Sequence, residues 1–341
     1  TFVVGVLRGE SVGDMFMAAV ALAVGAIPEG LPAAVTITLA IGVARMAQRH
    51  AIIRKMPAVE TLGSTTVICS DKTGTLTENQ MTVSRIWAGG QIWEVTGGGY
   101  EAKGDLQRDG QKADIGANQA LRKTLLAGLL CNDTQLVRKE DRLQVEGDPT
   151  EAALIVAGQK AGLDLQEVNE QQPRVDVLPF ESEHMYMATL HRDGDGRIIY
   201  KKGSVERLLD SCRQVLDAGG NEVPIDAVAV HRAVDAMASE GLRVLAFACR
   251  RLPVGHARLA REDVAGGLTL LGLQGMIDPP RAEAIRAVAR CQSAGIEVKM
   301  ITGDHKGTAV AIARQLGLRG GKGGGAEPAA VTGRELEQVS E

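Results

Sequence analysis

The sequence predicts an α/β protein in which one sheet domain is interrupted by a second, mixed α/β domain and preceded by a broken apolar helix. Three observations carry this prediction. An apolar run ends at Asp71 and another ends at Ile301, and each leads into a polar loop. Asp71 and Thr302 are 302 − 71 = 231 positions apart, so a parallel, Rossmann-like sheet that joins them must contain a domain-sized insertion. A long apolar run, Met15–Ala44, precedes both loops.

We therefore expect four parts along the 341 residues. Residues 1–13 are the end of a preceding transmembrane helix with its extracytoplasmic loop, and residues 14–46 are a transmembrane helix. Residues 47–84 and 268–341 form the sheet domain, which we expect to be truncated at its C-terminal side. Residues 85–267 are the inserted domain. We read the chain as a piece of a longer protein.

Composition argues against a nucleic-acid partner. The net charge is −4 and aromatic residues make up only 3%, so neither a basic surface nor a base-stacking platform is indicated. Five cysteines are scattered without a C-x-x-C pair. Free thiols in a reducing compartment are the expected state.

The apolar run is long enough to span a lipid bilayer. Glu29 is its only charged residue between Met15 and Ala44, and about 20 apolar residues suffice for a helix to cross. Arg8 before the run is accompanied by Glu10 and Asp14, whereas four basic residues follow the run with no acid before Glu60. This asymmetry predicts that the C-terminal end of the run faces the cytoplasm. Residues after about 47 would then be cytoplasmic, in a multi-pass protein of the cell membrane. The alternative is a buried helix of a soluble protein.

Two prolines flank the charged residue of this run. Pro28 and Pro32 lack an N–H and leave carbonyls without helical partners, and Gly30 loosens the backbone between them. Freed carbonyl oxygens beside the Glu29 carboxylate are ligands that suit a hard cation. A charged residue at this depth is costly unless it has a partner or a function. The alternative is a structural kink.

The heptad that begins at Asp71, DKTGTLT, predicts a nucleophile. A carboxylate at the end of a strand can attack phosphorus and divide a hydrolysis into two steps through an aspartyl-phosphate. The alternative is a threonine-rich turn capped by Asp71. After the second strand, Thr302, Gly303 and Asp304 offer a hydroxyl and an N–H to a phosphate. Asp278 precedes Pro279 and Pro280, a pattern typical of a helix start capped by the Asp.

The inserted domain shows a mixed pattern. Gly-rich turns predict two hairpins, and a capping box with Asp148 as cap and Glu151 as its partner opens a helix. The expected hairpin strands are 85–87 with 91–95 and 186–191 with 197–202, and the expected helices are 152–161, 205–215 and 227–239.

Taken together, these motifs resemble the P-type ATPases over nearly the whole chain. DKTGTLT is similar to the family's phosphorylation motif and Thr302–Asp304 to its TGD motif. Pro28–Pro32 resembles the fourth transmembrane helix of the calcium-pump branch. Four motifs of the insertion resemble the family's nucleotide-binding domain, in the family's order: Gly147–Glu151, Pro179–Ser182, Lys202–Glu206 and Gly241–Leu245.

The resemblance implies a haloacid-dehalogenase-like phosphorylation domain, ATP as substrate and Mg²⁺ as cofactor. It places Asp278 near the nucleotide and the hinge. It implies phosphorylation of Asp71 within a site that includes Lys72, with Mg²⁺ held by Asp71 and the Thr73 carbonyl. The implied nucleotide contacts are Glu151 at the adenine amino group, Phe180 stacked on adenine, Lys202, Gly203 and Leu245 lining the pocket, and Arg243 at the β-phosphate. The implied ligands of the transported cation are Glu29 and the carbonyls of Val24, Gly25 and Ile27.

We thus expect an ATP-driven cation pump, with Ca²⁺ as the favoured ion. The helix has no Cys, which argues against soft metals, but Mn²⁺ and Na⁺ remain open. A soluble phosphatase of the same superfamily is opposed by the apolar run and by Thr73, which occupies the position of that superfamily's acid–base Asp. A nucleotide-binding fragment without turnover also remains open, because we expect residues 1–341 to be inactive alone.

Overall fold

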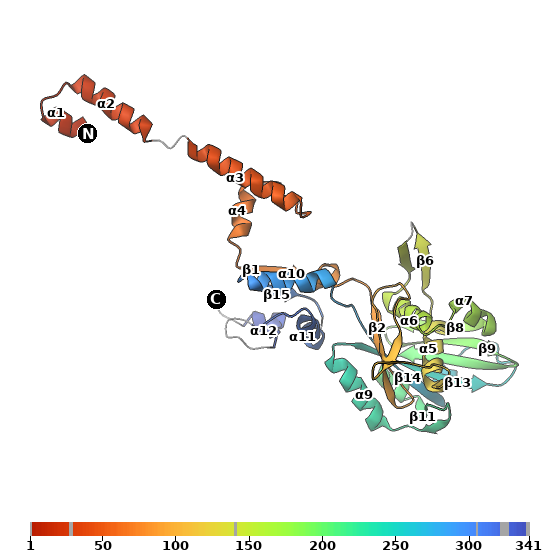
Figure 1. Cartoon of the computed structure of the whole chain (residues 1–341). Coiled ribbons are helices and arrows are strands. Elements are labelled where there is room, and N and C mark those ends of the chain that lie inside the picture. The colour runs from red at the N-terminus through yellow and green to blue at the C-terminus, as the bar shows by residue number, and fades with distance from the viewer. Residues whose placement is uncertain (1, 27–29, 140–141, 305, 321–326, 339–341) are drawn as a thin grey trace. The chain divides into compact units, whose positions relative to one another are not determined.

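The computed structural model describes residues 2–26, 30–139, 142–304, 306–320 and 327–338 (Figure 1). It divides into two compact units, residues 1–67 and 68–341, and each is described separately below. The fold class is α/β, as the sequence predicts, with an apolar helical segment at the N-terminus.

Among its described residues, the first unit contains four helices: α1 (Phe2–Leu7), α2 (Val12–Gly25), α3 (Gly30–Ala47) and α4 (Pro57–Gly63). The stretch Val12–Ala47 has a mean hydropathy of 1.7 and is long and apolar enough to cross a membrane. None of the apolar window is buried inside the protein. An apolar surface of this kind needs a non-aqueous environment or a partner to cover it.

In the second unit, β1 (Val67–Asp71) is hydrogen-bonded to β15 (Glu297–Ile301). A short helical turn, η1 (Lys72–Leu76), follows β1 directly. The helices of this part are α10 (Ala282–Ser293), α11 (Lys306–Gln315) and α12 (Gly333–Leu336). Two strands that lie far apart in the sequence are therefore neighbours. The two predicted polar loops, which start where these strands end, meet as a result.

The rest of this unit is built on a large sheet, which has eleven strands within the described ranges. Its main path runs β5-β4-β3-β2-β14-β13-β10-β9-β8, with β11 on β14 and β12 on β11. Neighbours are antiparallel except β11 and β14. The strands are β2 (Thr82–Ala88), β3 (Gln91–Val95), β4 (Leu106–Arg108), β5 (Gln111–Lys112), β8 (Arg174–Glu181), β9 (Tyr186–Asp193), β10 (Gly196–Gly203), β11 (Cys212–Leu216), β12 (Glu222–Pro224), β13 (Arg243–Leu252) and β14 (Leu268–Ile277).

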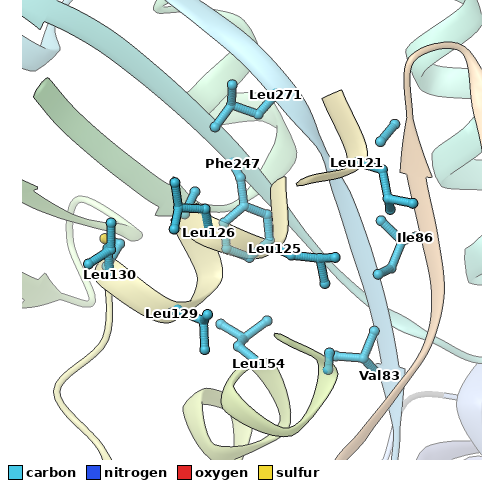
Figure 2. Close-up of a cluster of buried hydrophobic side chains, with 14 of the residues drawn as sticks. Val83, Ile86, Leu121, Leu125, Leu126, Leu129, Leu130, Leu154, Phe247 and Leu271 are labelled. Carbon is cyan, nitrogen blue, oxygen red and sulfur yellow. The ribbon is translucent and has the colours of Figure 1, made fainter. Parts of the chain in front are cut away.

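Helices α5 (Gln119–Leu130) and α6 (Pro149–Lys160) pack against the sheet, and their leucines form its largest core with residues of β2, β13 and β14. Figure 2 shows Leu125, Leu129 and Leu154 converging on Phe247. Gly158 lets the two helices approach closely, because a Cβ there would lie 2.8 Å from the side chain of Leu129. A second core lies under α8 (Val205–Leu209) and α9 (Ala227–Ser239).

Both predicted hairpins are present, as β2–β3 and β9–β10. The prediction of one helix over 205–215 is wrong: α8 ends at Leu209, and Cys212–Leu216 form β11. This strand is held by parallel pairing with β14, a contact that lies more than fifty positions away in sequence. The remaining elements are α7 (Leu165–Gln171), the 3₁₀ turn Arg261–Val264 and a separate hairpin, β6 (Gln135–Lys139) with β7 (Arg142–Glu146).

Candidate functional site

The loops after β1 and β15 meet at an ion pair. Lys72 Nζ lies 2.6 Å from Asp304 Oδ2, and the side chains are 10% and 30% exposed. Thr302 Oγ1 accepts a hydrogen bond from the Asp304 N–H at 3.1 Å. A charge-assisted bond between partly buried groups is stronger than one between neutral groups. The pair therefore fixes the Thr302–Asp304 loop beside the start of the Asp71 loop.

The backbone of the Asp71 loop is not a regular helix. Thr73 is extended at ψ 122°, and Gly74 has a φ of +73°, which favours glycine over any residue with a Cβ. Thr77 is fully buried and ends the loop: its N–H donates to the Lys72 carbonyl at 3.0 Å, and its Oγ1 lies 3.1 Å from the same oxygen. Asp71 and Thr73 are exposed as a result.

A segment after β14 braces this loop. Asp278 Oδ2 accepts from Thr77 Oγ1 at 2.6 Å, and Oδ1 accepts from the Gln80 N–H at 3.1 Å. Arg281 donates from Nε to the Thr77 carbonyl at 2.8 Å and from Nη2 to the Gly74 carbonyl at 3.1 Å. The prediction that Asp278 caps a helix is wrong, because α10 starts at Ala282 with Arg281 as its N-cap.

The Asp71 carboxylate has no hydrogen-bond or salt-bridge partner among the residues that the structure describes, and it is solvent-exposed. Thr302 is half-buried and Gly303 is exposed. The group expected to act as nucleophile is thus accessible, whereas Lys72 beside it is already engaged. A free carboxylate and the carbonyl of an exposed residue, Thr73, are hard oxygen ligands of the kind that Mg²⁺ takes.

A second cluster lies at one end of the large sheet. Lys202 and Gly203 end β10, and Gly203 is opposite Ala246 of β13, three residues after Arg243. Gly203 is also opposite Tyr186 of β9, which pairs with Glu181 of β8, next to Phe180. Two strand spacings separate β8 from β10, about 10 Å. The sheet thus brings these predicted nucleotide contacts to one end.

Glu151 and Lys202 form an almost buried ion pair at this end. Their Oε1 and Nζ atoms lie 2.5 Å apart, and the side chains are 14% and 8% exposed. Glu151 Oε2 accepts from the Asp133 N–H and from Thr134 Oγ1, both at 2.9 Å. Both carboxylate oxygens are therefore occupied within the protein, and Lys202 is held in a single position.

The predicted helix cap is partly confirmed. Asp148 Oδ1 accepts from the N–H groups of Thr150 and Glu151, at 2.7 and 3.3 Å, and Pro149 is the first residue of α6. The reciprocal half of the capping box is wrong, because the Asp148 N–H donates to Thr134 Oγ1 instead of to Glu151. Thr134 thus frees the Glu151 carboxylate to face Lys202.

The other predicted contacts differ in exposure. Phe180 is 58% exposed on β8, so its ring is available to a ligand. Arg243 is exposed, and Leu245 packs against the main core. Gly203 is required by packing, since a Cβ there would lie 2.4 Å from the Met185 carbonyl oxygen.

Sequence reasoning did not anticipate Thr77, Thr134 or Arg281. Thr77 lies within the DKTGTLT heptad, but each of the three residues bonds to groups distant in sequence, so no local pattern assigns its role. Cys131 was also not anticipated. It is fully buried, and burial raises the pKa of its thiol, against the opposing effect of the Lys202 charge.

In the first unit, Val24 and Gly25 are the last residues of α2. Ile27 and Glu29 lie outside the described residues. The predicted cation ligands therefore stay a sequence-based prediction.

The sequence matches a family model and several known proteins. Residues 120–283 match the family model described as P-type ATPase, cytoplasmic domain N. The whole chain is 55% identical to the cation-transporting ATPase pma1 of Synechocystis sp., covering 39% of that protein. It is 53% identical to the probable cation-transporting ATPase F of Mycobacterium tuberculosis, covering 38% of it. Over 92% of its length it is 41% identical to the calcium-transporting ATPase of Bacillus subtilis, covering 36% of it. The chain thus spans about two fifths of these relatives.

Proposed function

Because this chain belongs to the P-type ATPase family, we propose that it contains the nucleotide-binding and phosphorylated parts of an ATP-driven cation pump. Asp71 is the residue that becomes phosphorylated. The observation that carries this proposal is the exposed, unpaired Asp71 carboxylate beside a Thr302–Asp304 loop that the Lys72–Asp304 ion pair holds in place. Labelling of the full-length protein with radiolabelled ATP, followed by acid quenching, tests it.

In the proposed reaction, an Asp71 carboxylate oxygen attacks the γ-phosphorus of ATP. The new oxygen–phosphorus bond forms as the bond to the β-phosphate oxygen breaks, and ADP leaves with that electron pair. Thr302 Oγ1 and the Gly303 N–H donate to the oxygens of the moving phosphoryl group, whose charge needs such donors. The role of Lys72 is to position the Thr302–Asp304 loop, since its ammonium group already donates to Asp304. Mg²⁺, held by Asp71 and the Thr73 carbonyl, would neutralise phosphate charge.

We propose that Ca²⁺ is the transported ion and that its ligands are Glu29, Val24, Gly25 and Ile27. This proposal is based on the carboxylate flanked by prolines and on the relatives named calcium-transporting at 41% identity. The names of the relatives at 53–55% identity say that they transport cations but do not specify which one, so Mn²⁺ and Na⁺ are the alternatives. The segment Val12–Ala47 would cross the cell membrane, with the residues after about 47 in the cytoplasm.

The first prediction concerns Phe180. In the 341-residue chain, kept in detergent, Phe180→Ala should weaken ATP binding by about 1–3 kcal/mol, by analogy with bases stacked on aromatic rings. Because the ring is 58% exposed, its loss opens no core cavity. Calorimetric titration with ATP measures the change. Phe180→Tyr keeps the ring and should retain the affinity, while equal affinities for Ala and wild type would remove Phe180 from the site.

The second prediction separates two roles for Glu151. If Glu151 acts by holding Lys202, then Lys202→Met and the double variant with Glu151→Gln should weaken ATP binding to the same extent. Partners in one ion pair are typically coupled by about 0.5–3 kcal/mol. If Glu151 contacts adenine independently, the two losses should add. We expect coupling, because both Glu151 oxygens are occupied within the protein.

A further inference from the structure

A cavity of about 620 Å³ lies on the large sheet's domain, between the start of α5, the start of β10 and the end of β13. This volume is within the range of small-molecule sites. Its wall includes four cationic side chains and two carboxylates, so the lining carries a net charge of 4 − 2 = +2. The charged lining residues are Arg122, Lys123, Asp193, Glu222, Arg250 and Arg251.

The cavity is distinct from the proposed nucleotide contacts. Arg251 and Arg243 lie eight residues apart on β13, which corresponds to about 26 Å at the rise of a strand. Arg122 is in the first turns of α5, whereas Asp133, which bonds to Glu151, follows the end of that helix. The two sites therefore lie at opposite ends of the same elements.

Two of the four cations are engaged by the protein itself. Arg250 Nη1 donates to the carbonyls of Asp263 and Gly266, at 3.1 and 3.2 Å. Arg251 Nε lies 3.6 Å from Asp193 Oδ2. Asp193, Arg250 and Arg251 therefore already have partners within the protein.

Arg122 and Lys123 are different. Both are only partly exposed, and neither side chain has a hydrogen-bond or salt-bridge partner in the part of the chain that the structure describes. They occupy the fourth and fifth positions of α5 after its cap, Asn118. The positive end of the helix dipole disfavours cations there. Two unpaired, half-buried cations at that end create a local positive potential that an anion would relieve.

The part of the wall that contains Tyr200, Gln172 and Asp193 is held together by hydrogen bonds. Tyr200 Oη donates to Gln172 Oε1 at 2.9 Å, and Gln172 Nε2 donates to Asp193 Oδ1 at 3.1 Å. Cys249 also lines the cavity. Burial raises the pKa of its thiol to about 11, and the charge of Lys123, which also lines the cavity, opposes that rise.

We propose that this cavity binds a small molecule that carries a phosphate group, with the phosphate at Arg122 and Lys123 and the remainder against the Tyr200–Gln172 wall. Phosphate suits these partners because lysine and arginine both donate several N–H bonds to its oxygens. The same chemistry could come from a soluble metabolite or from a phospholipid headgroup.

Titration of the 341-residue chain in detergent tests the proposal, with inorganic pyrophosphate as the soluble probe and dihexanoyl phosphatidic acid, below its micelle concentration, as the lipid probe. Binding of either probe supports the site, and the probe that binds assigns the source. Arg122→Gln with Lys123→Gln should weaken binding roughly tenfold or more, the loss expected for charge-assisted hydrogen bonds. Added salt should also weaken it.

Two matched controls separate this site from others. Arg213→Gln with Arg232→Gln removes two exposed cations elsewhere on the domain and should leave probe binding unchanged. Arg243→Gln should weaken ATP binding and leave binding of the lipid probe unchanged, because Arg243 lies at the nucleotide end. Retained ATP binding shows that the Arg122/Lys123 variant is folded. Absence of binding by both probes, or binding that this folded variant retains in full, would overturn the proposal.

Discussion

Full-length protein carrying Asp71→Asn should form no acid-stable phosphoenzyme from ATP. An amide is not a nucleophile toward phosphorus, so the effect should be complete loss and not a reduced rate. Because Asp71 is exposed and unpaired, the substitution breaks no hydrogen bond or ion pair of the described residues. ATP binding should therefore persist. Acid-quenched labelling with radiolabelled ATP measures the phosphoenzyme, and release by hydroxylamine identifies an acyl phosphate.

Asp195→Asn is the matched control, since Asp195 is an exposed carboxylate in the turn between β9 and β10, far from Asp71 in sequence. It should label as the wild type does. Normal labelling of Asp71→Asn would place the phosphorylated residue elsewhere and would remove the basis of the proposed reaction. Loss of both labelling and ATP binding would indicate a folding defect instead.

Local patterns were sufficient for much of the fold. The Gly-rich turns predicted the β2–β3 and β9–β10 hairpins, and Asp148-Pro149 predicted the start of α6. Such turns and caps are determined by residues within a few positions of each other. The helix over 227–239 is also found with the predicted bounds, because its apolar face repeats with helical spacing.

The errors arise where distant partners decide. Glu151 is in position for a capping box, but Thr134 takes the cap N–H, and Lys202 takes the carboxylate. Asp278 precedes two prolines in a cap pattern, but it bonds to Thr77 and Gln80, about 200 positions earlier. Residues 212–216 became a strand because β14 was available for pairing. In each case a tertiary contact overrides a local preference, and those contacts shape the candidate sites.

The same reasoning explains why the Lys72–Asp304 pair was not foreseen as a pair. Lys72 and Asp304 each belong to a recognisable motif, and the sequence predicts that the two loops meet. Which of the charged side chains form an ion pair where the loops meet depends on the directions of those side chains, and the sequence spacing of the motifs does not determine these directions. The structure leaves Asp71 unpaired and engages Lys72, an assignment that bears directly on which group can react.

The second large effect is expected at Glu29. This residue is the only charge between Met15 and Ala44, and it lies between Pro28 and Pro32, which have no N–H to donate to a helical carbonyl. Carbonyl and carboxylate oxygens together are the ligand set of Ca²⁺. Glu29→Gln keeps the shape and removes the charge. In full-length protein it should raise the Ca²⁺ concentration needed for half-maximal phosphorylation from ATP by roughly tenfold or more. The reason is that a charged oxygen ligand of the cation is replaced by a neutral amide oxygen.

The readout is phosphoenzyme formed from ATP as free Ca²⁺ is varied, with ATP affinity measured in parallel. ATP affinity should not change, because the proposed nucleotide contacts belong to the other structural unit. Glu10→Gln, which neutralises an exposed acid before the apolar run, is the matched control and should leave the Ca²⁺ dependence intact. If Glu29→Gln also leaves it intact, the Pro-Glu-Gly segment is a kink and Ca²⁺ loses its support in this sequence. If Mn²⁺ or Na⁺, and not Ca²⁺, activates phosphorylation in a Glu29-dependent way, the site is right and the ion is wrong.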